Sequence, residues 1–111
     1  IRNCDWSSDV CSSDLKHVAL IKFKDGTTQD DIDKVFSDLL DVTEEVPGID
    51  DYVSGPNTSP EGLADGFTHA FVMTFRDVAA RDAYLPHPAH ERFKSAALPL
   101  VDKVLVLDFD V

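Results

Sequence analysis

Three segments of this chain alternate in the manner of β-strands, yet they are apolar on both of the faces that the alternation creates. They span residues 16–24, 68–75 and 104–109. A strand with one solvent-facing side would show polar residues at every second position. Any fold built from these segments must therefore cover its sheet on both sides.

An amphipathic helix is predicted after the first of these strands. Thr28 with Asp31 three residues later resembles a capping box, and the apolar residues between there and Pro47 recur at helical spacing. Residues 49–54 read as a weaker strand. Residues 55–66 hold two prolines and three glycines, which predicts a loop long enough to act as a lid or a contact arm.

Two prolines divide the second helical region. Asp77 is a candidate N-cap for a helix that ends near Tyr84, because Pro86 and Pro88 lack a backbone donor and disfavour helical geometry in the residue before them. Pro88 is well tolerated in a first turn, so a new helix can begin there, with His90 close to its start. The break brings a phenol and an imidazole together.

The predicted element order is β-α-β-β-α-β. This α+β arrangement is ferredoxin-like, and its helices cover only one face of an antiparallel sheet. The other face would expose a large apolar patch, which soluble monomers rarely do. That patch comprises Val18, Leu20, Val72, Leu105, Leu107 and Phe109. Since 111 residues leave no room for a second domain, we expect a homodimer in which two sheets pack together.

Composition narrows the function classes. The chain has 21 acidic and 10 basic residues, a formal charge of −11, which disfavours nucleic acid and anionic membranes as partners. Its apolar runs are too short to span a bilayer, and no secretion signal is recognisable, so we expect a cytoplasmic protein.

The first 15 residues differ from the rest. They hold both cysteines and the single tryptophan, without helical or strand periodicity, and they resemble translated sequencing adapter. We expect residues 1–15 to be a non-native or disordered extension and residues 16–111 to be one domain. A disulfide or a metal site at Cys4 and Cys11 is a remote alternative, because no further Cys or His lies nearby to complete a zinc site.

A set of motifs extends along the predicted domain: Lys16-His17-Val18, Tyr84, His87-Pro88-Ala89-His90, Phe93 and Leu107-Asp108. With these motifs the chain resembles the stress-responsive dimeric α/β barrel family, without gaps from about Lys16 to Asp110. The resemblance implies a dimeric barrel and a role in stress response. It also implies a cyclase-like activity, since polyketide cyclases of this family use the positions matching Tyr84 and His90 for aldol cyclisation.

The helix-facing side of the sheet is the candidate site. Small Ala19 leaves volume there, and a mostly apolar pocket with a few polar groups is the usual form of a ligand site. His17, His69 and Asp108 are expected to be neighbours at its mouth. We expect the ligand to be a small oxygenated aromatic or β-keto compound, bound by the following residues: His17, His69, Asp108, Ala19, Ile21, Phe36, Leu39, Phe71, Met73 and Phe93.

His90 and Tyr84 are the candidate catalytic residues. Neutral imidazole accepts a proton near pH 7, and a phenol donates a hydrogen bond where negative charge develops. Asp108 is placed to orient an imidazole. No cofactor is expected, because no heme or flavin ligand pattern is present.

Other interpretations stay open. The histidine-proline motif is also explained as a cap that fixes the helix break, in a non-catalytic stress-response protein that acts through stable homo-oligomer assembly. A metal site at His87, His90, His17 and Asp108 is a weaker alternative, because two histidines three residues apart lack the accompanying glutamate motif. Leu39 and Val101 stand where the cyclases carry larger aromatic residues, so the polyketide substrate does not carry over.

Overall fold

The computed structural model describes residues 14–111. Residues 1–13 of the predicted extension, which include both cysteines, lie outside the described residues. The elements in chain order are β1 (Leu15–Phe23), α1 (Gln29–Glu45), β2 (Ile49–Pro56), β3 (His69–Phe75), α2 (Val78–Tyr84), α3 (Pro88–Ala97), a 3-10 turn (Leu98–Leu100) and β4 (Val101–Asp110). The predicted ferredoxin-like order is confirmed, with its second helix in two pieces.

Strand β1 begins one residue before the predicted domain boundary. Leu15 is buried and lies opposite Phe75 on one neighbouring strand and Asp110 on the other. Leu15 is thus an integral part of the sheet, although the sequence analysis assigned it to the extension.

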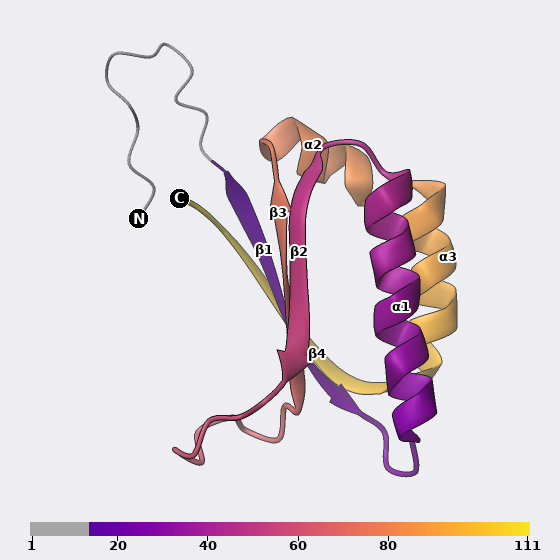
Figure 1. The fold of residues 1–111 in the computed structure, drawn as a ribbon, viewed down its shortest axis with the longest axis vertical. Helices are drawn as coiled ribbons and strands as arrows, with labels where there is room; N and C mark the ends of the chain where they lie inside the picture. The colour runs from indigo at the N-terminus through magenta and orange to yellow at the C-terminus, as the bar shows by residue number, and fades with distance from the viewer. Residues whose placement is uncertain (1–13) are drawn as a thin grey trace.

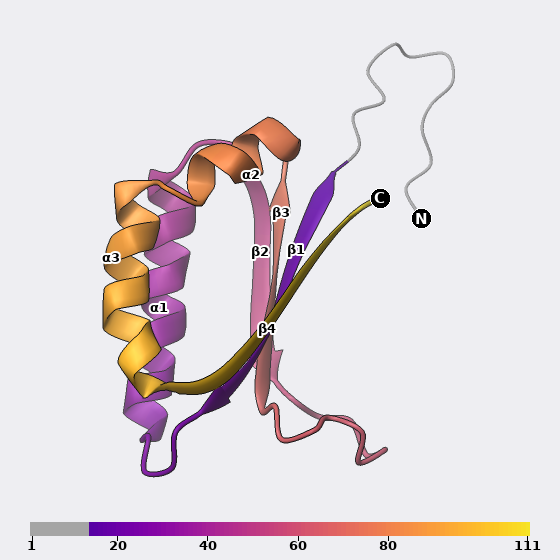
Figure 2. The same cartoon turned by 180° about the vertical axis from the view of Figure 1, so that it is seen from behind.

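The four strands form one antiparallel sheet in the order β2-β3-β1-β4. Helices α1 and α3 lie side by side on one face, and α2 crosses one end of the sheet (Figure 1). Figure 2 shows the same two layers from behind, with no helix on the opposite face. Among residues 14–111 the helices therefore cover one face of the sheet, and the space between the two layers lies on the α1–α3 side.

The helix ends follow from local side-chain chemistry. Thr28 Oγ1 accepts a hydrogen bond from the Asp31 amide at 3.1 Å, and the Asp31 carboxylate accepts one from the Thr28 amide at 3.3 Å. This reciprocal pair confirms the predicted capping box. Asp77 caps α2, as expected, by accepting from the Ala80 amide at 2.8 Å.

The core fills the space between the sheet and the helices. Its most buried large side chains are Leu39, Met73, Phe75 and Tyr84, each below 2% exposed. Full burial of an apolar side chain of this size contributes roughly 1.5–3 kcal/mol to folding. Tyr84 is the one of the four that carries a polar group into the interior.

The helix-free face of the sheet remains uncovered in the protomer. Leu107 is 55% exposed and Phe109 is 47% exposed, and Val53 and Leu105 lie on the same face. The loop between β2 and β3 projects to this side in both views (Figures 1 and 2). The loop therefore does not close over the helix-facing side, where the predicted site lies.

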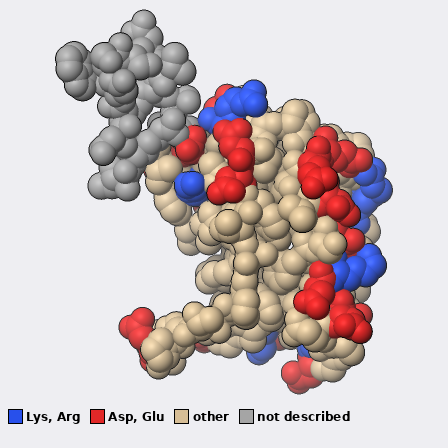
Figure 3. Space-filling model, viewed as in Figure 1, with Lys and Arg blue, Asp and Glu red and all other residues tan. Residues whose placement is uncertain are grey.

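Charge is distributed unevenly over the surface. Acidic side chains gather over α1 on the face seen in Figure 3, in agreement with the predicted solvent-facing side of that helix. None of the helices among residues 14–111 is long and apolar enough to cross a membrane.

Candidate functional site

A cavity of about 250 Å³ lies between the sheet and helices α2 and α3. His17 from β1, Tyr84 from the end of α2, and His90 and Lys94 from α3 supply its polar groups. The rest of its lining is apolar and includes Ile21, Phe71, Phe93 and Val106. A mostly apolar cavity with few convergent polar groups is the usual form of a small-molecule site.

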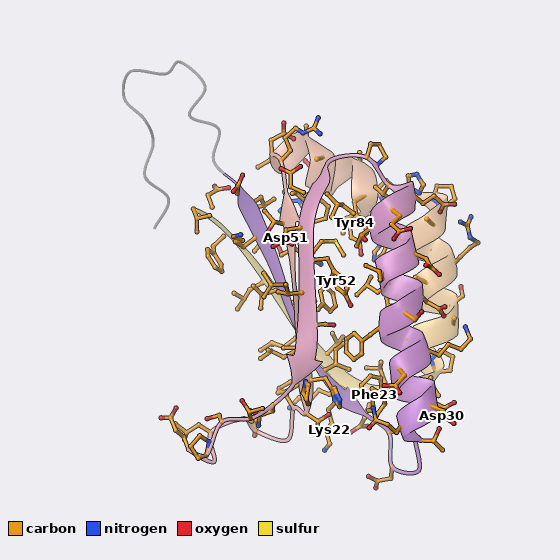
Figure 4. All side chains as sticks on the ribbon, viewed as in Figure 1. Lys22, Phe23, Asp30, Asp51, Tyr52 and Tyr84 are labelled. Atoms are coloured by element: carbon orange, nitrogen blue, oxygen red, sulfur yellow. The ribbon has the colours of Figure 1, made fainter. Side chains whose placement is uncertain are left out.

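Tyr84 and His90 are in direct contact. Their ring centroids are 4.2 Å apart with an angle of 33° between the planes. Tyr84 points into the space between the sheet and the helices (Figure 4). Among residues 14–111 its hydroxyl makes no hydrogen bond, and because no buried side-chain polar atom there lacks a partner, this hydroxyl keeps some accessible surface. Burial of the side chain raises the pKa of Tyr84. The phenol therefore stays protonated at neutral pH and has a donor to offer a ligand.

The helix break fixes the orientation of His90. Its Nδ1 donates a hydrogen bond to the Leu85 carbonyl at 2.9 Å, since a carbonyl oxygen can only accept. The neutral ring then carries its lone pair on Nε2. Burial lowers the pKa of His90, and the nearby Lys94 ammonium lowers it further. Both effects favour the neutral form, which can accept a proton.

His17 is held in the same tautomer by a carboxylate. Its Nδ1 donates to Asp108 Oδ1 at 2.7 Å across the β1–β4 pair. The other carboxylate oxygen accepts from Arg81 Nη1 at 2.9 Å. Partial burial would raise the pKa of Asp108, but the hydrogen bonds from Arg81 and His17 outweigh it and hold that pKa below its ordinary value. Asp108 is thus an anion at neutral pH that orients His17.

The expected proximity of His69 to His17 is wrong. Because β1 and β3 are antiparallel, His69 lies opposite Ile21, four residues along the strand from His17. Its ring packs against Phe23 and Phe36 at centroid distances of 5.3 and 5.7 Å. Its Nδ1 lies 2.9 Å from Thr68 Oγ1. Burial lowers the pKa of His69, in keeping with a partly buried neutral ring that lies outside the cavity lining.

The other predicted ligand contacts divide into two groups. Ile21, Phe71 and Phe93 line the cavity. The remaining four lie outside its lining and belong to the packed interior: Ala19, Phe36, Leu39 and Met73. Asp108 also stands outside the lining and reaches the cavity only through His17.

Two polar side chains near the site were missed by the sequence reasoning. Arg81 precedes Tyr84 by three residues and Lys94 follows His90 by four, so each lies on the same helix side as a predicted catalytic residue. That spacing was a usable signal. The partners of Arg81 and the contact of Lys94 with the cavity depend on tertiary packing.

His87 caps α3 and is not a ligand of the site. Its Nδ1 accepts a hydrogen bond from the Ala89 amide at 3.0 Å. Within the part of the chain that the structure describes, no three His, Asp or Glu side chains are grouped so as to hold a metal ion. The histidine-proline motif therefore combines a structural residue, His87, with one that faces the cavity, His90.

The sequence pattern of the Stress responsive A/B Barrel Domain family (Dabb) matches residues 15–111. The chain belongs to this family. Stress-response A/B barrel domain-containing protein HS1 of Arabidopsis thaliana is 35% identical to this A/B barrel domain protein over 95 residues, which are 86% of this chain and 87% of that protein. Olivetolic acid cyclase of Cannabis sativa is 27% identical over 95 residues, covering 86% of this chain and 94% of the cyclase.

Solved structures agree with the fold of this A/B barrel domain protein. Hydroxynitrile lyase from Passiflora edulis superposes with a TM-score of 0.84 at 26% identity, covering 90% of this chain and 94% of the lyase. A dimeric ferredoxin-like protein from Jannaschia sp. CCS1 superposes with a TM-score of 0.79 at 29% identity, covering 88% and 99% of the two chains. The predicted family and fold class are confirmed.

Proposed function

We propose that this A/B barrel domain protein binds a small oxygenated aromatic or β-keto compound in the cavity beside Tyr84 and catalyses proton transfer on it without a cofactor. The single observation that carries the proposal is the Tyr84–His90 pair. Their rings are 4.2 Å apart at the wall of an apolar cavity, and the phenol hydroxyl has no partner within residues 14–111.

His90 acts as the general base. Its Nδ1–H is held by the Leu85 carbonyl, so Nε2 is the atom that accepts the proton. It removes a proton from a carbon next to a carbonyl group of the ligand. The electrons of the broken C–H bond form a C=C bond, and the carbonyl oxygen becomes an enolate oxygen.

Tyr84 stabilises that oxygen. The hydroxyl of this largely buried residue donates a hydrogen bond to the enolate, and in a water-poor environment such a donor lowers the energy of a developing anion more than it would in solvent. The resulting enolate can attack a second carbonyl carbon of the same ligand, which is an aldol-type ring closure. The alkoxide formed by this attack takes the proton that His90 Nε2 had accepted, which returns His90 to its neutral form. His17, held by Asp108, has its Nε2 lone pair left to accept a hydrogen bond from the ligand.

The names of two relatives support this reaction class. One is a cyclase and the other a hydroxynitrile lyase. Both kinds of reaction make or break a bond at a carbon that bears or neighbours oxygen, and both require a positioned acid or base. We extend only this shared requirement to the present chain, because the residues around its cavity differ from those of the cyclases.

The test is ligand-induced thermal stabilisation with a set of small aromatic and β-keto compounds. We expect at least one compound to raise the melting temperature of the wild type, and Tyr84→Phe and His90→Gln to reduce the shift. Tyr52→Phe and His87→Asn are the matched controls, because both positions lie outside the cavity lining and Asn can replace His87 as a cap. The proposal fails if no compound raises the melting temperature of the wild type. It also fails if the control variants lose as much of the ligand-induced shift as the cavity variants do.

A second candidate function is a non-catalytic stress-response role through stable homodimer assembly. It is favoured by the uncovered sheet face, where Leu105, Leu107 and Phe109 are each about half exposed, and by the dimeric state named for a related structure. Under this alternative the dimer is the functional unit and substitutions at Tyr84 or His90 change stability only. Turnover of a stabilising compound by the wild type, lost in His90→Gln, would exclude it.

A further inference from the structure

The cavity beside Tyr84 has no carboxylate in its lining, although the chain holds 21 acidic and 10 basic residues. Of the fourteen lining residues, Lys94 is the one that carries a full charge at neutral pH, two are imidazoles, one is a phenol and the other ten are apolar. The neighbouring groove between α1 and α3 differs, since three carboxylates, those of Asp38, Asp41 and Glu45, line it together with one cation, Arg92. Negative charge is thus kept out of one concave surface and gathered on another.

The acidic group behind the cavity wall is already compensated. Asp108 accepts hydrogen bonds from His17 at 2.7 Å and from Arg81 at 2.9 Å. Because a cationic partner contacts one of its oxygens, its negative charge does not repel an anion in the cavity. The lining of the cavity itself then contributes one cation and no carboxylate.

That cation is Lys94. It follows His90 by four residues on α3, so both side chains point to the same side of the helix. Its ammonium pairs with Glu91 at 2.9 Å, and the two side chains are 39% and 55% exposed. Exposed pairs of this kind contribute little to stability, so another carboxylate can displace Glu91 at little cost.

We infer that the ligand carries a carboxylate that is bound by Lys94 at the rim, while its apolar body lies along Phe71 and Phe93. This inference rests on the proposed function and narrows its substrate class to small organic acids. Four residues of helix rise about 6 Å, roughly the width of one aromatic ring, so the carboxylate lies about one ring away from the reacting group near His90.

The test compares 2,4-dihydroxybenzoate with 2,4-dihydroxybenzamide, which has nearly the same shape and no charge, by calorimetric titration at pH 7. We expect the acid to bind the wild type at least tenfold more tightly than the amide, and the advantage to shrink as salt is added. Lys94→Gln should remove the advantage. Glu91→Gln should increase it severalfold, because Lys94 then has no competing partner.

Lys34→Gln is the matched control. Lys34 forms a similar exposed pair with Asp38 at 2.8 Å on α1, and it lies outside the cavity lining. Its substitution should leave both affinities unchanged. Equal binding of acid and amide by the wild type, or an equal loss of both in Lys94→Gln, would overturn the inference and leave the proposed binding site standing. Failure of both compounds to bind would also overturn the inference, and the thermal-stabilisation test of the wider compound set then decides whether the proposed binding site stands.

Discussion

Asp108 and His17 face each other across two antiparallel strands, with 2.7 Å between Oδ1 and Nδ1. The second oxygen of the same carboxylate accepts a hydrogen bond from Arg81, which lies on α2. One side chain thus connects β1, β4 and the helix that ends at Tyr84, and it is a group on which both stability and site geometry depend.

Replacing Asp108 should make the stability of the protein less sensitive to acid. The folded-state pKa of Asp108 lies below the ordinary value of about 3.9, so the unfolded chain binds this proton more readily. The stability it contributes is present above about pH 4 and is lost as the pH falls through the folded-state pKa. At pH 7 we expect Asp108→Asn to lower the free energy of unfolding by about 2 kcal/mol, the typical value for a hydrogen bond to a charged group.

Urea unfolding between pH 2.5 and pH 7 provides the measurement. The wild-type and Asp108→Asn curves should converge at the acidic end. Asp82→Asn is the control, because Asp82 also contacts Arg81 but is 60% exposed. Parallel curves for the wild type and Asp108→Asn would contradict the assigned role of this carboxylate.

His90 should titrate below the ordinary histidine value of about 6.5. Burial is the main cause, and Lys94 and His17 act in the same direction, while the Leu85 carbonyl and Glu91 oppose them. The neutral form is favoured in the folded state, so the associated stability is present above about pH 6.5 and is lost as the pH falls through the folded-state pKa.

The ring proton signals of His90, followed by NMR across pH 4 to 8, report this pKa directly. Lys94→Gln should raise it relative to the wild type, and Glu91→Gln should lower it. A His90 titration at or above pH 6.5 would show that the ring is solvated and would remove the case for a neutral base.

The close approach of α2 to the turn after α1 should make Gly48 intolerant of a side chain. Gly48 has a φ of +91°, and a Cβ there would lie 2.6 Å from Ala80 Cβ. Gly26 has a similar φ of +87° with nothing within 4 Å of an added Cβ. Gly26→Ala should therefore cost about 1 kcal/mol from backbone strain alone, and Gly48→Ala about 1–3 kcal/mol more.

Chemical denaturation of the two alanine variants separates strain from steric clash. Equal losses at Gly26 and Gly48 would mean that α2 shifts freely to make room. Such a shift would also displace Tyr84. In that case the Gly48→Ala variant should show a smaller ligand-induced rise in melting temperature than the wild type.

The uncovered sheet face should hold two protomers together. Leu107 on that face is 55% exposed in the protomer, and Leu40, which lies on α1 beside the start of β2, is 47% exposed. We expect Leu107→Lys to convert a dimer at micromolar concentration into a monomer, and Leu40→Lys to leave the dimer intact. Light scattering coupled to gel filtration distinguishes the two, and a wild-type monomer or a dissociated Leu40→Lys variant would contradict this assignment.

The sequence was informative wherever the determinants are local. The capping box of Thr28 and Asp31, the cap at Asp77 and the new helix at Pro88 each depend on residues within one turn, and all three predictions are confirmed. The element order likewise predicted the ferredoxin-like sheet, and the apolar pattern on both strand faces predicted the apolar face that the helices leave uncovered.

The site was harder to predict because it depends on strand register and helix rotation. His69 was grouped with His17 because each begins its strand, but the starts of antiparallel neighbours lie at opposite ends. Met73 is expected at the wall from its apolar character and Leu39 from the family resemblance, but an apolar residue fits a packed core equally well. The contacts of Arg81 with Asp108 and of Lys94 with the cavity link elements that no sequence period relates.

The interruption between α2 and α3 has a geometric consequence for how such a protein can diversify. Residues six positions apart on one continuous helix are rotated by about 240° about its axis, so Tyr84 and His90 would diverge from each other. Because each ring is instead carried by its own short helix, substitutions in the three residues between the helices can change how the two rings are oriented. Neither helix, nor the sheet beneath them, has to change.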